Sequence, residues 1–251
     1  MEDIKTKHQV HVPKRVREYM FELLSTFVAV ALAFLSQYYF QYRSDRSTEH
    51  DLMVSLVADL RTDIKNIDKL STSTPEFEKS MISLRNLCLS EHSTFDLQKR
   101  MLQFSIVGFG RTYFVNFAQG TISQLKNAGG LRLIKDSNII DAITEYDNTK
   151  QHLDTYAQNV GISKHDFLQH LEKSFLLNSI NIASFDHADL VKIFTKHKSL
   201  ILNDSFDLLA EFSNSCFIFE TASVGYSMQC EGLKKQAENL IELIQSRYHI
   251  D

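Results

Sequence analysis

The sequence predicts an all-α protein in which one N-terminal transmembrane helix is followed by an elongated helical bundle. Two observations predict this fold. Residues Leu23 to Tyr42 form a run of twenty residues without a formal charge, close to the start of an otherwise polar chain. Only two prolines and eight glycines occur in 251 residues, and this scarcity of helix breakers favours long helices over a sandwich of short strands.

The uncharged run has the length of a membrane span. A helix of this length, at about 1.5 Å per residue, extends roughly 30 Å, which is the thickness of the hydrocarbon core of a bilayer. Tyr38, Tyr39 and Tyr42 lie at its end, where an interfacial aromatic belt is expected. The alternatives are a buried helix of a soluble domain and a cleaved secretory signal. The run is longer than a usual signal h-region, and no small-x-small cleavage site follows it. We therefore expect an uncleaved signal anchor over residues 19–42.

Basic residues predict the orientation of this anchor. Five precede the uncharged run, whereas Arg43 and Arg46 alone follow it within a comparable distance. The preceding residues are Lys5, Lys7, Lys14, Arg15 and Arg17. This excess predicts that the leader, residues 1–18, is cytoplasmic and that residues 43–251 lie across the membrane. The bilayer is therefore an expected partner. Nucleic acid is not, because the net charge is −4 and the sequence has no basic stripe.

Residues 43–251 are long enough to form one domain with its own core. Between Ser47 and Leu70, apolar residues recur at steps of four and three, which predicts a coiled-coil-like juxtamembrane helix over residues 47–70. The residues of this seam are Met53, Val57, Leu60, Ile64 and Ile67. The polar stretch that follows is expected to end this helix. Thr74 and Pro75 then resemble the N-cap and first position of a new helix that extends to about residue 89.

The remaining helices are expected at residues 95–104, 121–127, 139–177, 184 or 186–197, and 205–248. Gly129 and Gly130 are expected to stop the helix at residue 127, and Asp136 is expected to help cap the next. The segment 106–117 contains Gly108 and Gly110. We expect it to be a turn and not a phosphate loop, because it lacks a preceding buried strand and a third glycine.

The three cysteines are Cys88, Cys216 and Cys230. Their number is odd and their spacing is not that of a metal site. We expect three buried free thiols, and one disulfide with a spare thiol is the alternative, so that the sequence leaves their redox state open.

Two segments carry a family resemblance. The first is Glu22-Leu-Leu…Ala31-Leu-Ala-Phe-Leu-Ser-Gln followed by a helix with Leu56, Asp59 and Leu60, and the second is Gly120-Thr-Ile-Ser-Gln-Leu-Lys-Asn-Ala-Gly-Gly-Leu-Arg-Leu-Ile-Lys-Asp. This pattern resembles an uncharacterised membrane-anchored family common in Bacteroidota, known as domain of unknown function 6090. Here Phe21 replaces the family's glycine before Glu22. The resemblance implies a bacterial inner-membrane location and a helical extracytoplasmic domain, and it implies no activity.

Chemistry-bearing residues gather in one place. His165, Asp166 and His170 are candidate metal ligands, because Asp166 and His170 are four residues apart and share a helix face; Glu172 lies close by. Solvated polar residues on a helix explain the same cluster, so no metal, cofactor or catalytic residue is expected. Asp59 and Asp63 also share a helix face, and solvated pairing with Arg61 and Lys65 is expected there.

The uncharged run carries a stripe of small and polar residues along one helix face, at steps of four and three: Glu22, Thr26, Ala29, Ala33 and Ser36. Small residues let two helices approach closely, and hydroxyls can bond across the pair. The stripe and the seam therefore predict a homo-oligomer, and a lone anchor with incidental small residues is the alternative.

Three functions follow from these patterns. The first is a non-enzymatic, membrane-anchored scaffold or sensor that binds an unidentified protein partner and itself. The second is an oligomeric pore or membrane-disrupting effector, with Thr26, Ser36 and Gln37 facing a lumen. The third is a metal or acid–base enzyme near His165–Glu172. The first is our expectation, because the sequence contains no Gly-x-Ser-x-Gly elbow and no recognisable Cys–His pair.

Overall fold

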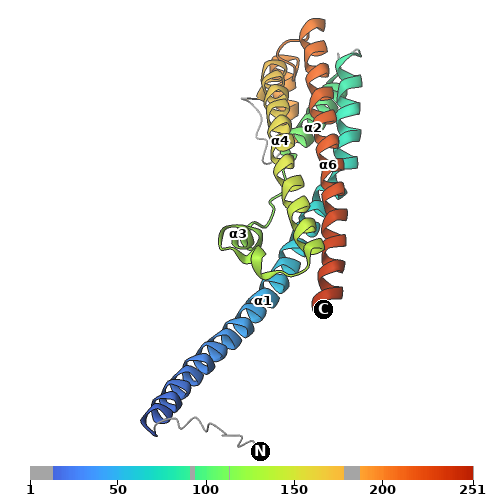
Figure 1. The fold of residues 1–251 in the computed structure, drawn as a ribbon. Coiled ribbons are helices and arrows are strands. Elements are labelled where there is room, and N and C mark those ends of the chain that lie inside the picture. The colour runs from blue at the N-terminus through green and yellow to red at the C-terminus, as the bar shows by residue number, and fades with distance from the viewer. Residues whose placement is uncertain (1–13, 91–93, 113, 178–186, 251) are drawn as a thin grey trace, which may run out of the picture. The chain divides into compact units, whose positions relative to one another are not determined.

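The structure, a computed structural model, describes residues 14–90, 94–112, 114–177 and 187–250 (Figure 1). These residues form six α-helices and one 3-10 helix, and their only β-type pairing is an isolated bridge between Phe175 and Ile201. The helices are α1 (Lys14–Cys88), α2 (Phe95–Gly110), α3 (Gly120–Asn127), η1 (Gly130–Leu133), α4 (Ser137–Ser174), α5 (His187–His197) and α6 (Phe206–Tyr248). The predicted all-α class is confirmed.

The contacts divide the chain into two units, Met1–Asp51 and Leu52–Asp251. Leu52 is the first apolar residue of the buried core, and the limits predicted for the membrane segment, residues 19–42, stay a prediction. In the first unit, the described residues form the N-terminal part of α1. Residues 1–13 of the predicted leader lie outside the described residues, and α1 already begins at Lys14.

In the second unit, α4 and α6 lie side by side and run in opposite directions (Figure 1). The later part of α1 joins their apolar faces. The ring of Phe219 on α6 stands 5.1 Å from that of Phe77 on α1 and 5.4 Å from that of Phe167 on α4, between ring centroids. These three rings are completely or almost completely buried, so the three long helices share one core.

The predicted break after residue 70 is wrong. Helix α1 continues to Cys88 with Pro75 inside it. Pro75 has no N–H to donate to the carbonyl one turn earlier, so the helix loses one backbone bond at this point. The hydroxyls of Ser73 and Thr74 each donate to the carbonyl of Leu70, at 2.9 Å. A Thr-Pro pair that resembles a helix start therefore lies within a longer helix.

The predicted turn at Gly108 and Gly110 is also wrong in its first half. Helix α2 extends to Gly110 and not only to residue 104. Gly108 is buried within α2. It lies so close to the ring of Phe167 on α4 that a side chain at this position would overlap that ring. The described residues 111–112 and 114–119, which follow α2, are irregular.

The other helix ends lie close to the predicted ones. Asp136 caps α4 by accepting from the N–H of Asn138 at 3.0 Å, and Gly129 takes the left-handed φ of 70° just after α3. Helix α4 continues through Gly161 and ends at Ser174, before the predicted residue 177. The first described residue of α5 is His187, and both residues predicted to start this helix, 184 and 186, lie outside the described residues.

Candidate functional site

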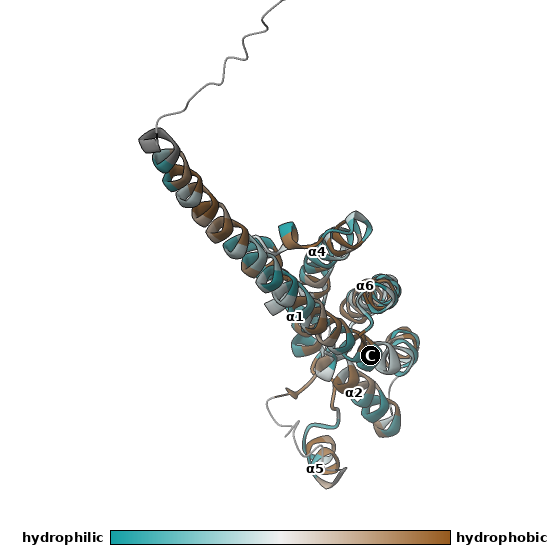
Figure 2. Cartoon of the chain, turned by 60° about the horizontal axis from the view of Figure 1, so that its bottom comes forward, coloured by the Kyte–Doolittle hydropathy of each residue, from teal (hydrophilic) through white to brown (hydrophobic). Residues whose placement is uncertain are grey.

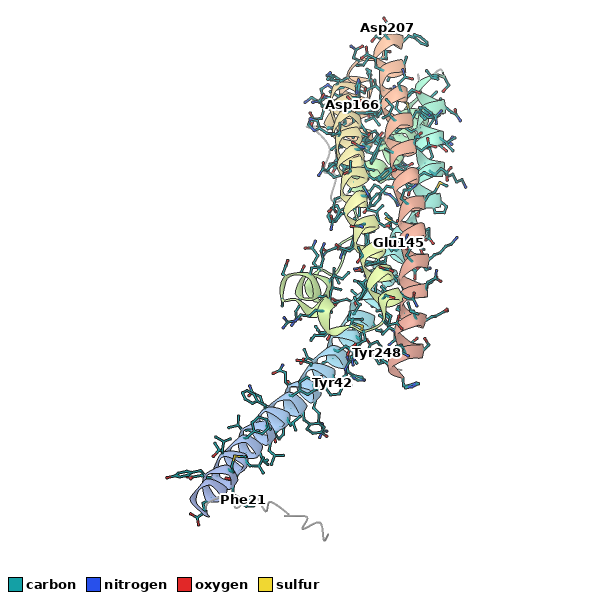
Figure 3. The ribbon with its side chains drawn as sticks, in the orientation of Figure 1. Phe21, Tyr42, Glu145, Asp166, Asp207 and Tyr248 are labelled. Atoms are coloured by element: carbon teal, nitrogen blue, oxygen red, sulfur yellow. The ribbon has the colours of Figure 1, made fainter. Side chains whose placement is uncertain are left out.

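The uncharged part of α1 exposes its apolar side chains. Phe27, Phe34 and Leu35 are 70%, 67% and 64% exposed, and their apolar neighbours are similarly open. Figure 2 shows this part of α1 as a succession of hydrophobic turns, and in Figure 3 the side chains between Phe21 and Tyr42 project outwards around the helix. Of the described helices, α1 is the one long and apolar enough to cross a membrane.

All five residues of the predicted small-residue stripe are exposed on this part of α1. Two hydroxyls near its start turn back to their own helix: Ser25 Oγ and Thr26 Oγ1 donate to the carbonyl of Glu22, at 2.9 and 3.0 Å. Thr26 keeps its oxygen lone pairs as acceptors for a second helix. Self-association through Glu22, Thr26, Ala29, Ala33 and Ser36 stays a prediction.

The residues of the juxtamembrane seam lie in the core of the second unit. Met53, Val57, Leu60 and Ile67 are buried in the core of the second unit, and Ile64 packs partly buried against it. In this chain the seam is therefore covered by its own core, and self-association through these residues stays a prediction. The heptad pattern identifies a buried face correctly, but it does not distinguish a partner in the same chain from one in another.

One residue of the histidine cluster, His170, lies between a carboxylate of its own helix and a carboxylate of α6. His170 Nδ1 lies 3.7 Å from a carboxylate oxygen of Asp166, and Nε2 lies 3.7 Å from one of Glu211 on α6. The ring of His165 instead pairs with Gln169 at 3.0 Å. Within the described residues, no group of three or more His, Cys, Asp or Glu side chains is arranged to hold a metal ion. The structure therefore separates His165 from the pair formed by Asp166 and His170.

The prediction that Asp59 and Asp63 are solvated and paired with Arg61 and Lys65 is wrong, because Asp63 is buried. Its carboxylate is 1% exposed and accepts from the N–H of Ala118 at 2.7 Å and from the hydroxyl of Tyr146 at 2.7 Å. Asp59 accepts from the N–H of Thr121 at 3.1 Å. Burial raises the pKa of Asp63, although these two donors and the charge of Lys150 oppose that shift. Asp63 thus holds the loop before α3 against α1, and Asp59 holds the first turn of α3.

That loop, residues 114–119, is held by side chains from three helices. Lys150 Nζ on α4 donates to the carbonyl of Ala118 at 2.8 Å, and Tyr226 on α6 accepts from the N–H of Val115 at 3.0 Å. Asn66 on α1 donates to the carbonyl of Asn116 at 2.9 Å. Irregular backbone that is partly buried needs partners for its N–H and C=O groups, and here side chains supply them.

Two cavities border this loop, and Phe114, Val115 and Asn116 line both of them. The first, of about 600 Å³, is also lined by α1 and the end of α2. The second, of about 440 Å³, is lined on its other side by residues of α3, α4 and α6, among them Lys126, Asp147 and Lys150. Lys126 Nζ and Asp147 form an ion pair of 2.6 Å there.

Arg111 is the residue of the first cavity with unusual electrostatics. It is 6% exposed, and its guanidinium donates to Ser73 Oγ at 2.6 Å and to Thr74 Oγ1 at 2.7 Å. The guanidinium carbon also lies 4.8 Å from the ring centroid of Phe77. Its Nε–H has no acceptor among the described residues, and burial lowers the pKa of the group. The sequence analysis missed Arg111, because no local pattern marks an arginine that will be buried.

Comparison of the chain with models of protein families, with curated proteins and with solved structures finds no match. The resemblance to domain of unknown function 6090 therefore stays a prediction. The geometry of the apolar helix, the buried carboxylates and the Arg111 cavity are the observations on which function has to be argued.

Proposed function

We propose that this chain is a single-pass, non-enzymatic membrane protein whose helical unit, Leu52–Asp251, serves as a scaffold or sensor for protein partners. The observation that carries this proposal is the exposure of the uncharged part of α1. Burying apolar surface gains about 25 cal/mol per Å², so leaving this many large apolar side chains in water is costly. Contiguous exposed apolar surface of this extent is typical of a membrane or protein contact.

A bilayer suits this helix better than a protein partner does. Apolar side chains project from all sides of the segment, as Figure 3 shows between Phe21 and Tyr42, whereas a partner helix covers one face. Within residues 23–42 no side chain carries a formal charge, and tyrosines gather at residues 38–42. Lipid requires both features: an uncharged middle and amphipathic rings at the headgroup level.

The orientation belongs to the same proposal. The basic residues before the segment favour a cytoplasmic N-terminus, which leaves Leu52–Asp251 on the periplasmic side of a bacterial inner membrane. The bacterial assignment rests on the family resemblance. A reporter fused at residue 251 tests the topology: alkaline phosphatase, which folds actively only outside the cytoplasm, is expected to be active. A cytoplasm-active reporter fused at the same place is expected to be inactive, and the reverse result would contradict the orientation.

Membrane anchoring is tested by fractionating the full-length protein. The wild type is expected in the pelleted membranes after alkaline extraction and in the supernatant after addition of detergent. The double variant Val28→Lys, Leu32→Lys places two charges in the segment. Each costs about 2.5 to 3.5 kcal/mol on insertion scales, so this variant is expected to leave the alkaline-extracted membranes.

The matched control is Ile162→Lys, Met228→Lys. These two positions are at least as exposed as Val28 and Leu32 but lie in the second unit. This control is expected to stay in the membrane fraction. Recovery of the wild type in the supernatant without detergent would refute the anchor, and equal behaviour of the two lysine pairs would show that the segment has no special role.

A further inference from the structure

We propose that the cavity between α1 and α2 binds a small organic carboxylate, and that Arg111 holds its carboxylate group. The ligand would carry one negative charge and an apolar body. This site lies wholly within the second unit and does not depend on whether the first unit spans a membrane.

The first step of the argument is the unbalanced charge of Arg111. A cation removed from water is costly unless an anion accompanies it, and buried charges in proteins are normally paired. Arg111 forms no ion pair with any described residue; its two acceptors are neutral hydroxyls. Burial alone is the cause of its lowered pKa, with no carboxylate opposing it. The site therefore has a cation in place with no described carboxylate paired to it.

The second step is the way in which Arg111 is held. Ser73 and Thr74 bind its guanidinium, Phe77 covers one face of it, and Lys164 Nζ donates to its backbone carbonyl at 2.9 Å. A side chain fixed in this way loses little further freedom when it binds a ligand. The buried Nε–H has no acceptor among the described residues, and a carboxylate accepts well from adjacent N–H groups of a guanidinium.

The third step is the composition of the cavity. Its volume of about 600 Å³ lies within the range of small-molecule sites, roughly 300 to 1,000 Å³. The charged residues in its lining are Lys69, Arg111 and Glu76, so its formal charge is +1. Leu70, Val107 and Phe114 provide apolar walls. One net positive charge matches a carboxylate better than a doubly charged phosphate, and the apolar walls match a hydrocarbon or aromatic body.

The binding experiment uses the full-length protein in a neutral detergent and isothermal titration calorimetry. The probes are octanoate, benzoate, 1-octanol and inorganic phosphate. Octanoate represents an acid derived from lipid, and benzoate represents a soluble aromatic acid, so their relative affinities distinguish the two sources. At least one carboxylate is expected to bind about tenfold or more tightly than 1-octanol. Inorganic phosphate is expected to bind more weakly than that carboxylate. Failure of both carboxylates to bind, or binding of the better carboxylate no tighter than that of 1-octanol or of phosphate, would overturn the proposal.

Variants then locate the carboxylate. Arg111→Met is expected to weaken octanoate about 10- to 100-fold, to the level of 1-octanol, and to leave 1-octanol unchanged. A purely structural role of Arg111 would instead weaken both probes. Arg100→Met is the matched control, since Arg100 lies exposed on α2, the helix that ends just before Arg111, and does not line the cavity. It is expected to bind as the wild type does.

A second pair of variants tests the place of the ligand without changing Arg111, so the test holds even if the Arg111 variant does not fold. Lys69 is exposed on α1 and lines the cavity, whereas Lys65 is exposed one turn earlier and does not. Lys69→Met is expected to weaken octanoate by a factor of about two to five, the size of an exposed charge interaction, and Lys65→Met to leave it unchanged. Equal affinities for octanoate in both lysine variants would contradict the assigned place of the ligand.

Discussion

The ring of Phe167 lies directly against the backbone of Gly108. A Cβ atom built on Gly108 would stand 2.7 Å from Cζ of Phe167 and 3.1 Å from Cε of Met81. Phe167 is fully buried and packs against Phe212 and Phe219, so its ring has no room to withdraw. The glycine is thus required for α2 to approach α4 closely.

Gly108→Ala is therefore expected to lower the free energy of unfolding by about 1 to 3 kcal/mol, the usual cost of overpacking. Alanine favours helix, so propensity alone predicts the opposite sign. Gly225→Ala is the control, because Gly225 lies inside α6 with no neighbour within 4 Å of an added Cβ. It is expected to raise stability by about 0.5 to 1 kcal/mol. Urea unfolding measures both, and a stabilised Gly108→Ala would contradict the packing.

Asp63 predicts a pH dependence of stability. Burial raises the pKa of Asp63 in the folded state above 3.8, the ordinary value that the unfolded chain keeps. Between the unfolded-state pKa and the higher folded-state pKa, the folded protein therefore holds a proton that the unfolded chain has released. The free energy of unfolding of the wild type therefore falls as pH rises through this window. Asp63→Asn removes that contribution. Its stability relative to the wild type is expected to improve as pH rises above about 4, measured by urea unfolding.

The control for this experiment is Asp141→Asn, an exposed carboxylate on the same helix as Tyr146. Its difference from the wild type is expected to be nearly constant over the same pH range. If the variant Asp63→Asn instead loses stability relative to the wild type as pH rises towards neutrality, the hydrogen-bond donors and the charge of Lys150 outweigh the effect of burial on the pKa of Asp63.

The cysteines predict slow thiol chemistry. Cys88, Cys216 and Cys230 are free and buried, and burial raises the pKa of Cys88 and of Cys230 to about 12. Because the thiolate is the reactive form, iodoacetamide is expected to leave the native protein essentially unlabelled and to label all three thiols in guanidinium chloride, as counted by mass spectrometry. An added Glu238→Cys, exposed on α6, is expected to react in the native protein. Rapid native labelling at Cys88 would contradict the packing.

The small-residue stripe predicts self-association in the membrane. Ala29→Leu with Ala33→Leu enlarges two residues of the stripe, which separates the helix backbones and is expected to abolish most of the cross-linked dimer in membrane vesicles. Val28→Phe with Val30→Phe adds at least as many side-chain carbon atoms outside the stripe and is expected to leave the dimer. Equal cross-linking of the two double variants would show that the stripe is not the interface.

The fold class could be predicted because it depends on local properties. Few breakers, apolar residues at helical spacing and caps such as Asp136 each act over one or two turns. The predictions were wrong where contacts with residues far away in the chain determine the local structure. Thr74 and Pro75 have the local pattern of a helix start, but Thr74 Oγ1 bonds to Ser227 on α6 and receives a donor from Arg111, and the helix continues.

The buried polar groups could not be predicted for the same reason. Asp63 meets Ala118 and Tyr146, which are 55 and 83 residues away in the chain, and no spacing rule connects them. The heptad seam identified Met53 and Leu60 as a buried face, but it did not reveal that helices of the same chain cover that face. Periodicity indicates which face of a helix is buried, and it does not indicate which element covers that face.

The loop of residues 114–119 is shared by the two cavities, because Phe114, Val115 and Asn116 line both of them. Asn66, Tyr226, Lys150 and Asp63 bond to the backbone of this loop. A ligand that displaces these three lining residues in one cavity therefore also alters the wall of the other, so occupancy of the two cavities is expected to be coupled.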